Sequence, residues 1–467
     1  MRKILITLLL ALSCLGFASE SYLGLYLQGT KLGYSVSSED EEMVSGEPLK
    51  RTSSKTVMNA GLLGAAMSIV IESRSWLNEK GPVRMEMSVE SAGRTQKLKA
   101  QFREKDILVS IDNSGNVSSK TLELPSDGKV VDDALTALLT SNVPIGTKRT
   151  FYVLDPMTAS LVKNEVTLKG PAKVTVKGVS YDSTLIEISE QRANTRAYVS
   201  AKGDLIKAEG PMGIEMIPVS KEEALSESGS SDRPTDLADV TKIKPNKPIG
   251  DASNLGSLKL KITGRELSKL PSDAHQTVRQ EGESWIVEIH PVANVPGVAI
   301  AAAAKQQPAW VKRAMYVPAG NERFGKLAKK VTAGSKTVGS AANAVAQYVF
   351  KTMKPNAGIG VLRDAHEVLD SKEGVCRDYA VLTATLLRSA GVPSRVVSGL
   401  VHQDGAFYYH AWVEVWNGSN WAGVDSTRPN GKVTAGHIKL AQGNVEEAFN
   451  FTFLDQVKVE VLDARRR

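Results

Sequence analysis

Alternation of apolar and polar residues is the main pattern in the first half of the chain. In YLGLYLQGTKLGYSV, residues 22–36, an apolar residue stands at almost every second position on both sides of Gly29. This period of two predicts strands with one buried face, and the glycine predicts a hairpin turn between them. The pattern recurs as far as residue 218, with one clear helical stretch at 132–140. We therefore predict an antiparallel β domain over residues 19–218, built as a sandwich or as a curved, barrel-like sheet.

The composition changes over residues 219–254, which are rich in Ser, Asp, Lys and Pro and poor in large apolar residues. Such a stretch is typical of a linker, here with a short helical start. Strand patterns return within residues 256–290, in SLKLKITG and SWIVEIHP. We expect a second domain over residues 255–467.

The period changes again from about residue 318. Apolar residues then recur every three to four positions, which predicts helices, in the stretches 321–332, 340–354 and 376–390. Gly391 is the expected C-terminal cap of the third helix. Strand patterns follow at 394–401, 407–416 and 421–427. The predicted fold class of this domain is α+β, with helices packed on an antiparallel sheet.

The first 18 residues have the pattern of a secretory signal peptide, with a basic start, an apolar stretch at 4–12 and small residues before Ser19. We expect cleavage there and a secreted or periplasmic protein. Lipid attachment at Cys14 is the alternative, although Ala11 stands where lipoprotein signals usually carry leucine. Two later apolar runs, 57–71 and 292–304, are shorter than the ~20 residues of a membrane-spanning helix, so no transmembrane span is expected.

Composition and charge narrow the functional classes. Hydrophobic residues make up 42% and charged residues 23% of the 467 residues, as in globular proteins that bury a core. The net charge is +7, but the basic residues form no stripe interleaved with aromatic residues. Nucleic acid is therefore not an expected partner, whereas an anionic cell envelope is compatible with the charge. No two histidines or cysteines have metal-ligand spacing, and no phosphate-loop motif occurs, so we expect neither a metal nor a cofactor.

Cys376 is the only cysteine outside the signal sequence, so it has no partner for an intramolecular disulfide. An odd cysteine in an exported protein indicates a reactive thiol or an intermolecular link, while an inert buried cysteine is the alternative. The residue opens the predicted helix at 376–390, directly after Gly374 and Val375. Free backbone N–H groups and the helix dipole at such a position lower the pKa of a thiol.

A thiolate needs a proton acceptor, and histidine suits that role near neutral pH. Of the six histidines, His410 lies on the predicted strand FYYHAWVEVW, on the same face as Trp412 and Glu414. The opposite face is apolar enough to be core, so we expect the face of His410 to be wet or functional. A solvated or core strand histidine is the alternative for His410 taken alone.

Asp425 lies on the next predicted strand, after the turn NGSN. A two-residue loop would place Asp425 directly opposite His410, and a four-residue loop would place it diagonally opposite, on the same face. A three-residue loop would shift the register by one and put Asp425 on the other face. Two of the three registers therefore give a nucleophile, a base and a carboxylate that orients the base.

The three blocks AHEVLDSKEGVCRDYAVLTATLLRSAGVPSRVVSG, YYHAWVEVW and WAGVDST together resemble the bacterial transglutaminase-like superfamily. The likeness is strongest over residues 364–430 and covers about 318–440. It implies a papain-like fold with Cys376 as the nucleophile, His410 as the base and Asp425 as the carboxylate. This chain has Ser426 where the family often has proline.

These observations predict an exported thiol enzyme that acts on peptide or carboxamide bonds of a protein or peptide substrate, through a thioester acyl-enzyme. Water as the acceptor would make it a protease or amidase, and an amine would make it an acyltransferase. The alternative is a non-catalytic cell-envelope binding or assembly module with the same fold.

Overall fold

The structure is a computed structural model, and the chain divides into two compact units. The first unit comprises Met1–Leu237 with Gly358–Val361, and the second comprises Ala238–Ala357 with Leu362–Arg467. The predicted signal peptide, residues 1–18, lies outside the described residues. The described residues are 20–27, 29–62, 65–91, 93–113, 115–141, 143–156, 159–190, 193–210, 213–226, 241–264, 270–292, 297–359, 362–449 and 457–466.

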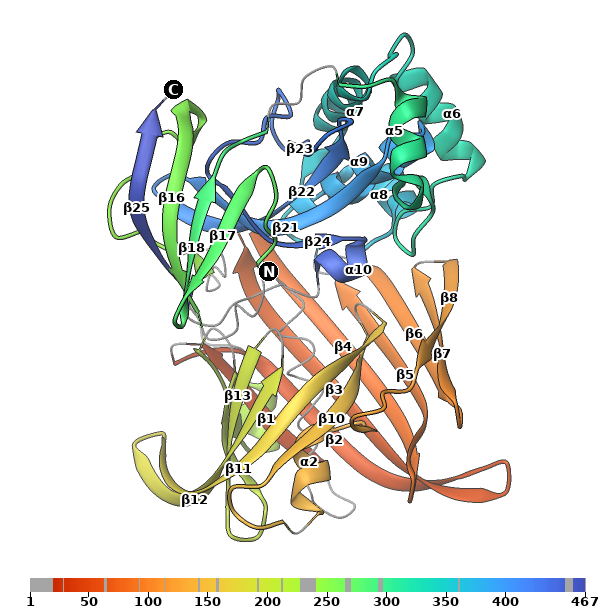
Figure 1. Ribbon diagram of the computed structural model, residues 1–467. Helices are drawn as coiled ribbons and strands as arrows, with labels where there is room; N and C mark the ends of the chain where they lie inside the picture. The colour runs from red at the N-terminus through yellow and green to blue at the C-terminus, as the bar shows by residue number, and fades with distance from the viewer. Residues whose placement is uncertain are drawn as a thin grey trace. The chain divides into compact units, whose positions relative to one another are not determined.

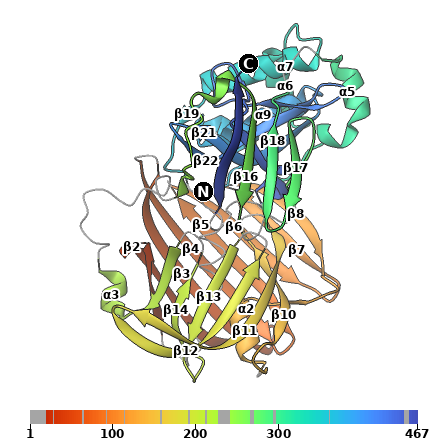
Figure 2. The same cartoon turned by 60° about the vertical axis from the view of Figure 1, so that its left-hand side comes forward.

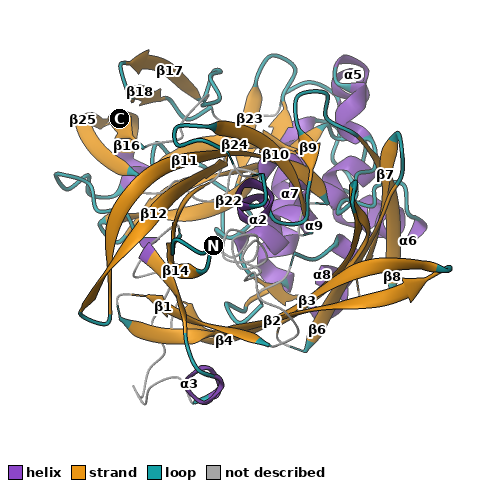
Figure 3. Ribbon diagram, turned by 90° about the horizontal axis from the view of Figure 1, so that it is seen from below, coloured by secondary structure: helices purple, strands orange, loops and turns teal. Residues whose placement is uncertain are grey.

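Fifteen strands of the first unit form one sheet, in the order β8-β7-β6-β5-β4-β3-β2-β1-β15-β14-β13-β12-β11-β10-β9. All neighbours are antiparallel except the short pair β9–β10. The sheet curves strongly when it is seen from below (Figure 3). One continuous hydrogen-bonded sheet selects the curved, barrel-like arrangement over the sandwich. The strands are β1 Ser21–Leu27, β2 Thr30–Val44, β3 Glu47–Leu62, β4 Ala65–Asn78, β5 Gly81–Ser91, β6 Arg94–Phe102, β7 Asp106–Asn113, β8 Asn116–Glu123, β9 Lys129–Val130, β10 Lys148–Asp155, β11 Ser160–Val176, β12 Val179–Glu190, β13 Ala193–Val199, β14 Leu205–Glu209 and β15 Ile214–Pro218.

The predicted hairpin and helix of the first unit are confirmed. Strands β1 and β2 pair with Leu23 opposite Ser35, and Gly29 between them has φ of 79°. A positive φ is accessible to glycine without strain, which explains the turn. Helix α2, Ala134–Leu139, lies within the predicted range and begins after Asp133, whose side chain accepts a hydrogen bond from the N–H of Leu135.

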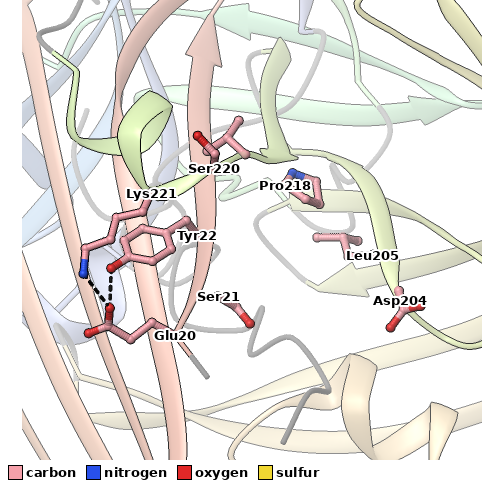
Figure 4. A pocket seen from close by; sticks show the side chains of 9 residues that line it. Glu20, Ser21, Tyr22, Asp204, Leu205, Pro218, Ser220 and Lys221 are labelled. Atoms are coloured by element: carbon pink, nitrogen blue, oxygen red, sulfur yellow. Dashed lines mark hydrogen bonds and ion pairs between the residues drawn. The ribbon is translucent and has the colours of Figure 1, made fainter. Parts of the chain in front are cut away.

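A cavity of about 580 Å³ lies in the first unit, beside the start of β1 (Figure 4). At its edge Glu20 accepts hydrogen bonds from Tyr22 at 2.5 Å and from Lys221 at 3.1 Å. Lys221 opens the short helix α3, Lys221–Leu225, where the sequence predicted a helical start. The ion pair is solvent-exposed, and such pairs contribute little to stability.

The second unit contains two four-stranded sheets and most of the helices. The first sheet has the order β17-β18-β16-β25, whose strands lie side by side in Figure 2. The second has the order β23-β22-β21-β24, and helix α9 packs on β21 and β22 (Figure 1). The strands are β16 Leu255–Thr263, β17 Gln276–Glu281, β18 Ser284–Ile289, β19 Lys354–Pro355, β20 Glu373–Gly374, β21 Ser394–Gln403, β22 Ala406–Trp416, β23 Trp421–Val424, β24 His437–Gly443 and β25 Lys458–Arg466. The helices are α5 Ile300–Gln306, α6 Glu322–Val331, α7 Val338–Thr352, α8 Ala365–Ser371, α9 Cys376–Ser389 and α10 Val445–Ala448, with 3₁₀ turns at Ala252–Asn254 and Pro308–Val311.

The three predicted helices of this unit correspond to α6, α7 and α9, and the three predicted strands correspond to β21, β22 and β23. Gly391 has φ of 79°, as expected of a residue that ends a helix in the left-handed region. Helices on antiparallel sheets give the predicted α+β class. Among the described residues, every helix is too short or too polar to cross a bilayer.

Part of the stretch predicted as a linker belongs to the folded second unit. Ile243 forms an isolated antiparallel bridge with Phe407, with both N–H···O distances at 2.8 Å. Ala252 is buried in the core that lies between the two sheets of this unit. A polar composition was therefore a poor guide over residues 243–254, since a few apolar residues are enough to anchor the segment.

The face of β22 that carries His410 is buried at Trp412 and Glu414 and partly exposed at His410 itself, whereas the sequence left this face as wet or functional. Trp412 and Glu414 are each only 1% exposed. Glu414 is compensated by Arg395 on β21, at 2.6 Å, and by Lys439 on β24, at 2.9 Å. Asp273 also contacts Arg395, at 3.1 Å, and Lys439. Two cations thus balance two carboxylates, which makes burial of the charges tolerable.

Replacing Lys439 by methionine is expected to lower the free energy of unfolding of the second unit by about 3–5 kcal/mol, because Glu414 would keep only Arg395 as a buried partner. Urea unfolding followed by tryptophan fluorescence measures this change. Lys458→Met, at an exposed position on β25, is the matched control and should unfold close to wild type. Equal midpoints for the two variants would contradict the compensation argument.

Candidate active site

Cys376 is the first residue of α9, as the sequence predicted, and its side chain is partly exposed. The start of this helix is fixed by Asp378, which accepts a hydrogen bond from the N–H of Val375 at 2.9 Å. Arg363 donates to the other carboxylate oxygen of Asp378 at 3.2 Å, and both side chains are fully buried. The thiol therefore stands at a rigid helix N-terminus, where the dipole favours the thiolate.

Gly374 is required by close packing beneath this helix start. A Cβ atom at residue 374 would lie 2.5 Å from Oδ2 of Asp378 and 2.7 Å from Nη2 of Arg363. Both distances are shorter than van der Waals contact. Asp378 and Arg363 are the buried pair that fixes the turn before Cys376. Any residue larger than glycine at position 374 would therefore overlap with this pair.

The turn between β22 and β23 is a four-residue loop, one of the loop lengths considered from the sequence. Trp416 pairs with Trp421, and the side chain of Asn417 accepts hydrogen bonds from the N–H groups of Ser419 and Asn420, at 3.0 and 2.9 Å. Extending this register places Asp425, directly after β23, diagonally opposite His410 on the same face. The structure thus adopts one of the two registers that bring the imidazole and the carboxylate together.

Asp425 is fully buried and accepts several hydrogen bonds. Oδ2 accepts from Nε2 of His410 at 3.0 Å and from Nε of Arg428 at 3.2 Å. Oδ1 accepts from the N–H of Thr427 at 3.0 Å and from its hydroxyl at 2.7 Å. Burial opposes ionisation, but the charge and hydrogen bond of His410 hold the pKa of Asp425 well below its usual range. The carboxylate is therefore ionised and held in one orientation.

Cys376 and His410 interact directly and favour each other's charged forms. Burial opposes ionisation of the thiol, yet the hydrogen bond and charge of His410, with a smaller contribution from the N–H of Ala411, lower the pKa of Cys376. The side chain of His410 is only 12% exposed, and this burial opposes a positive charge on the ring. The charge and hydrogen bond of Asp425, with a smaller contribution from Cys376, nevertheless raise the pKa of His410 to about 10. Because Nε2 faces Asp425, Nδ1 is the ring nitrogen left for the thiol. The structure thus brings together all three residues singled out in the sequence.

Ser426, the departure from the family pattern, has a structural role here. Its hydroxyl lies 2.7 Å from the hydroxyl of Thr383 on α9, and both side chains are buried. The contact joins the end of β23, which carries Asp425, to the helix that carries Cys376. A hydroxyl at this position therefore supports the site.

Two neighbours of the site lie outside the three residues singled out in the sequence. The ring of Trp412 lies nearly parallel to that of His410, with 6.2 Å between centroids and 23° between planes, so it packs against one face of the imidazole. His437 on β24 approaches Asp425, with Nε2 3.3 Å from Oδ2. Trp412 could be found from its strand alternation with His410. No local signal identifies His437, which reaches the site only through the pairing of β24 with β21.

The cluster of His410, Asp425 and His437 has the composition of a metal site, with its ligand atoms within 4.8 Å of one another. In the structure these atoms are hydrogen-bonded to each other, and two of the three residues are fully buried. The donor set therefore fits a proton network better than a metal centre.

A cavity of about 670 Å³ opens beside His410. Its walls come from the loop before β16, from the turn between β21 and β22, and from the segment after Asp425. The lining residues include Asp251, Asp404 and Arg428. A ligand in this cavity would therefore reach the imidazole and would meet charged groups of both signs.

Replacing Gly374 by alanine is expected to lower the free energy of unfolding by about 1–3 kcal/mol through overpacking against Asp378 and Arg363, and to slow alkylation of Cys376. Chemical unfolding and mass spectrometry of the alkylated peptide measure the two effects. Gly325→Ala is the control, because a Cβ there meets nothing within 4 Å and alanine is the better helix former. A wild-type midpoint for Gly374→Ala would contradict the packing argument.

Comparison with known proteins finds that the region around the site is similar to a described superfamily. The sequence profile of the Transglutaminase-like superfamily matches residues 325–426. An uncharacterized protein of Mycobacterium leprae is 35% identical over 92 residues, which cover 18% of this chain and 32% of that protein. A protein-glutamine gamma-glutamyltransferase of Pseudomonas aeruginosa is 40% identical over 74 residues, which cover 13% of this chain and 11% of that protein. The matches thus span a third or less of these relatives.

Among solved structures, a β-barrel-like protein of Brucella abortus with a domain of unknown function aligns with a TM-score of 0.33 and 9% identity. The alignment covers 43% of this chain and 95% of that protein. The profile match spans Cys376, His410 and Asp425, so the part of the second unit that holds the site is similar to the Transglutaminase-like superfamily.

Proposed function

We propose that this protein is an exported thiol enzyme that acts on peptide or carboxamide bonds through Cys376, His410 and Asp425, on a papain-like core. The observation that carries the proposal is the arrangement just described: a thiol of lowered pKa at a helix N-terminus, an imidazole that contacts it, and a buried carboxylate 3.0 Å from the far ring nitrogen. A thiol, a base and an orienting acid in this order are the components of covalent acyl transfer.

In the proposed reaction the Cys376 thiolate attacks the carbonyl carbon of the substrate, and the backbone N–H groups at the start of α9, with one further donor, stabilise the oxyanion. The imidazolium of His410 then gives its proton to the leaving amine or ammonia, which leaves a thioester on Cys376. His410 next takes a proton from the acceptor, and the acceptor's attack on the thioester releases the product and the Cys376 thiolate, which restores the ion pair with the protonated His410. Asp425 stays ionised and holds the ring throughout.

The acceptor decides the type of reaction. Water gives hydrolysis, as in a protease or amidase, and an amine gives transamidation. The similarity to a protein-glutamine gamma-glutamyltransferase supports a protein glutamine carboxamide as one acyl donor to test. The predicted signal peptide supports a secreted or periplasmic setting with cell-envelope proteins or peptides as substrates.

Alkylation of Cys376 by iodoacetamide tests the ion pair without a substrate. A lowered thiol pKa keeps the thiolate populated below the ordinary value of ~8.5, so at pH 6 wild type should react roughly tenfold or more faster than His410→Ala. Mass spectrometry of the peptide that holds Cys376 gives the rates. His290→Ala, at an exposed histidine, is the matched control and should react like wild type. A thiol no faster in wild type than in His410→Ala would contradict the proposal.

Incubation of a cell-envelope extract with wild type or with Cys376→Ala tests the chemistry itself. New protein termini, deamidated glutamines or cross-links that appear only with wild type would identify hydrolysis of peptides, hydrolysis of carboxamides or acyl transfer, respectively. Identical extracts, together with an unreactive thiol, would instead favour a non-catalytic binding or assembly module.

A further inference from the structure

His437 lies directly behind the candidate site and contacts its carboxylate. Its side chain is fully buried at the start of β24, and its Nε2 lies 3.3 Å from Oδ2 of Asp425. The same oxygen accepts the hydrogen bond from His410 at 3.0 Å. Asp425 therefore lies between two imidazoles, of which that of His410 contacts Cys376.

The tautomer of His437 follows from its second ring nitrogen. The backbone N–H of Thr434 lies 3.1 Å from Nδ1, and an N–H group can only donate, so Nδ1 is an acceptor. A neutral ring then carries its proton on Nε2 and donates it to Asp425. Burial lowers the pKa of His437 to about 4, against the smaller opposing effect of Asp425, so the ring is neutral at physiological pH.

The backbone around His437 is held on both sides. His437 pairs with Val401 in the sheet, and its N–H donates to the carbonyl of Thr434 at 3.1 Å. On the other side His275 donates from Nε2 to the carbonyl oxygen of His437 at 2.8 Å. The hydrogen bond from the N–H of Thr434 to Nδ1 holds the ring as well, so His437 is a donor fixed in place beside Asp425.

We propose that His437 is a positioning residue of the site, which donates a hydrogen bond as a neutral imidazole to keep Asp425 ionised and oriented toward His410. This inference rests on the proposed function, since it assigns a role within the same reaction. A neutral donor suits the role because it stabilises the carboxylate without adding a positive charge, which would oppose protonation of His410.

A metal at this cluster would need the lone pair of Nε2 of His437. The proton would then move to Nδ1, where it would face the N–H of Thr434 at 3.1 Å. That arrangement sets two donors against each other in a buried site, which is costly. The hydrogen bonds therefore favour the positioning role over metal ligation.

The test compares His437→Phe, which keeps a ring but has no donor, with His437→Gln, whose amide N–H can take the place of Nε2–H. The measurement is the rate of Cys376 alkylation from pH 4 to 9, which reports protonation of the coupled groups. The charged or titratable groups that face Asp425 and His437 are Cys376 on α9, His410 on β22, Arg428 after β23 and His275 beside β17.

Loss of the donor should weaken the hold of Asp425 on the His410 imidazolium, which in turn stabilises the Cys376 thiolate. The acid limb of the profile should therefore move up by about one pH unit, or tenfold in proton affinity of the thiolate, in His437→Phe. His437→Gln should restore most of the wild-type profile. His366→Gln, at a half-buried histidine that packs on Phe324, is the matched control and should leave the profile unchanged. Melting temperatures of all variants show whether the fold is kept.

Wild-type profiles in both His437 variants would overturn the inference while leaving the proposed function intact. A wild-type protein without acid-range reactivity would instead refute the proposed function. If His437→Phe does not fold, nitrogen-15 NMR of the wild-type histidines decides the point. A neutral His437 with its proton on Nε2 from pH 5 to 8 supports the role, whereas an Nδ1–H tautomer, a charged ring or stoichiometric bound zinc overturns it.

Discussion

The site depends on keeping one fully buried carboxylate charged. Burial of Asp425 raises the cost of its negative charge, and the protein offsets that cost with donors from separate parts of the chain. His410 comes from β22, Thr427 and Arg428 follow β23, and His437 comes from β24. Because one oxygen receives three of these groups, the position of the carboxylate is fixed by the sheet as a whole. The orientation of the imidazole beside Cys376 follows from it.

The thiol is held from the opposite side by a second buried charge. Asp378 fixes the first turn of α9 through the N–H of Val375 and is itself paired with Arg363. The absence of a side chain at Gly374 leaves the room that this pair needs. The hydroxyl contact between Ser426 and Thr383 then links this helix to the strand end that carries Asp425. Nucleophile and carboxylate are thus related through a short chain of buried contacts.

Buried charges also hold the sheet in the register on which the site relies. Glu414 on β22 binds Arg395 on β21 and Lys439 on β24, so three adjacent strands are joined by side chains as well as by their backbones. Lys439 lies two residues after His437, and Gln276 binds both backbone groups of Lys439, at 2.8 and 2.9 Å. A shift of β24 would break these contacts and withdraw His437 from Asp425. The network therefore stabilises the fold and the geometry of the site together.

The sequence by itself determined the elements whose signals are local. The period of two predicted β1 and β2, the helical periods predicted α6, α7 and α9, and the position of Cys376 after Gly374 predicted its place at a helix start. The tertiary structure decided what depends on contacts between distant residues. These include the four-residue turn that sets Asp425 diagonally to His410, the burial of Glu414, the anchoring of residues 243–254 and the approach of His437 to Asp425. The residues next to a side chain in the sequence do not indicate which strand will pair beside it. The register and the pairing of buried charges are therefore decided only when the sheet forms.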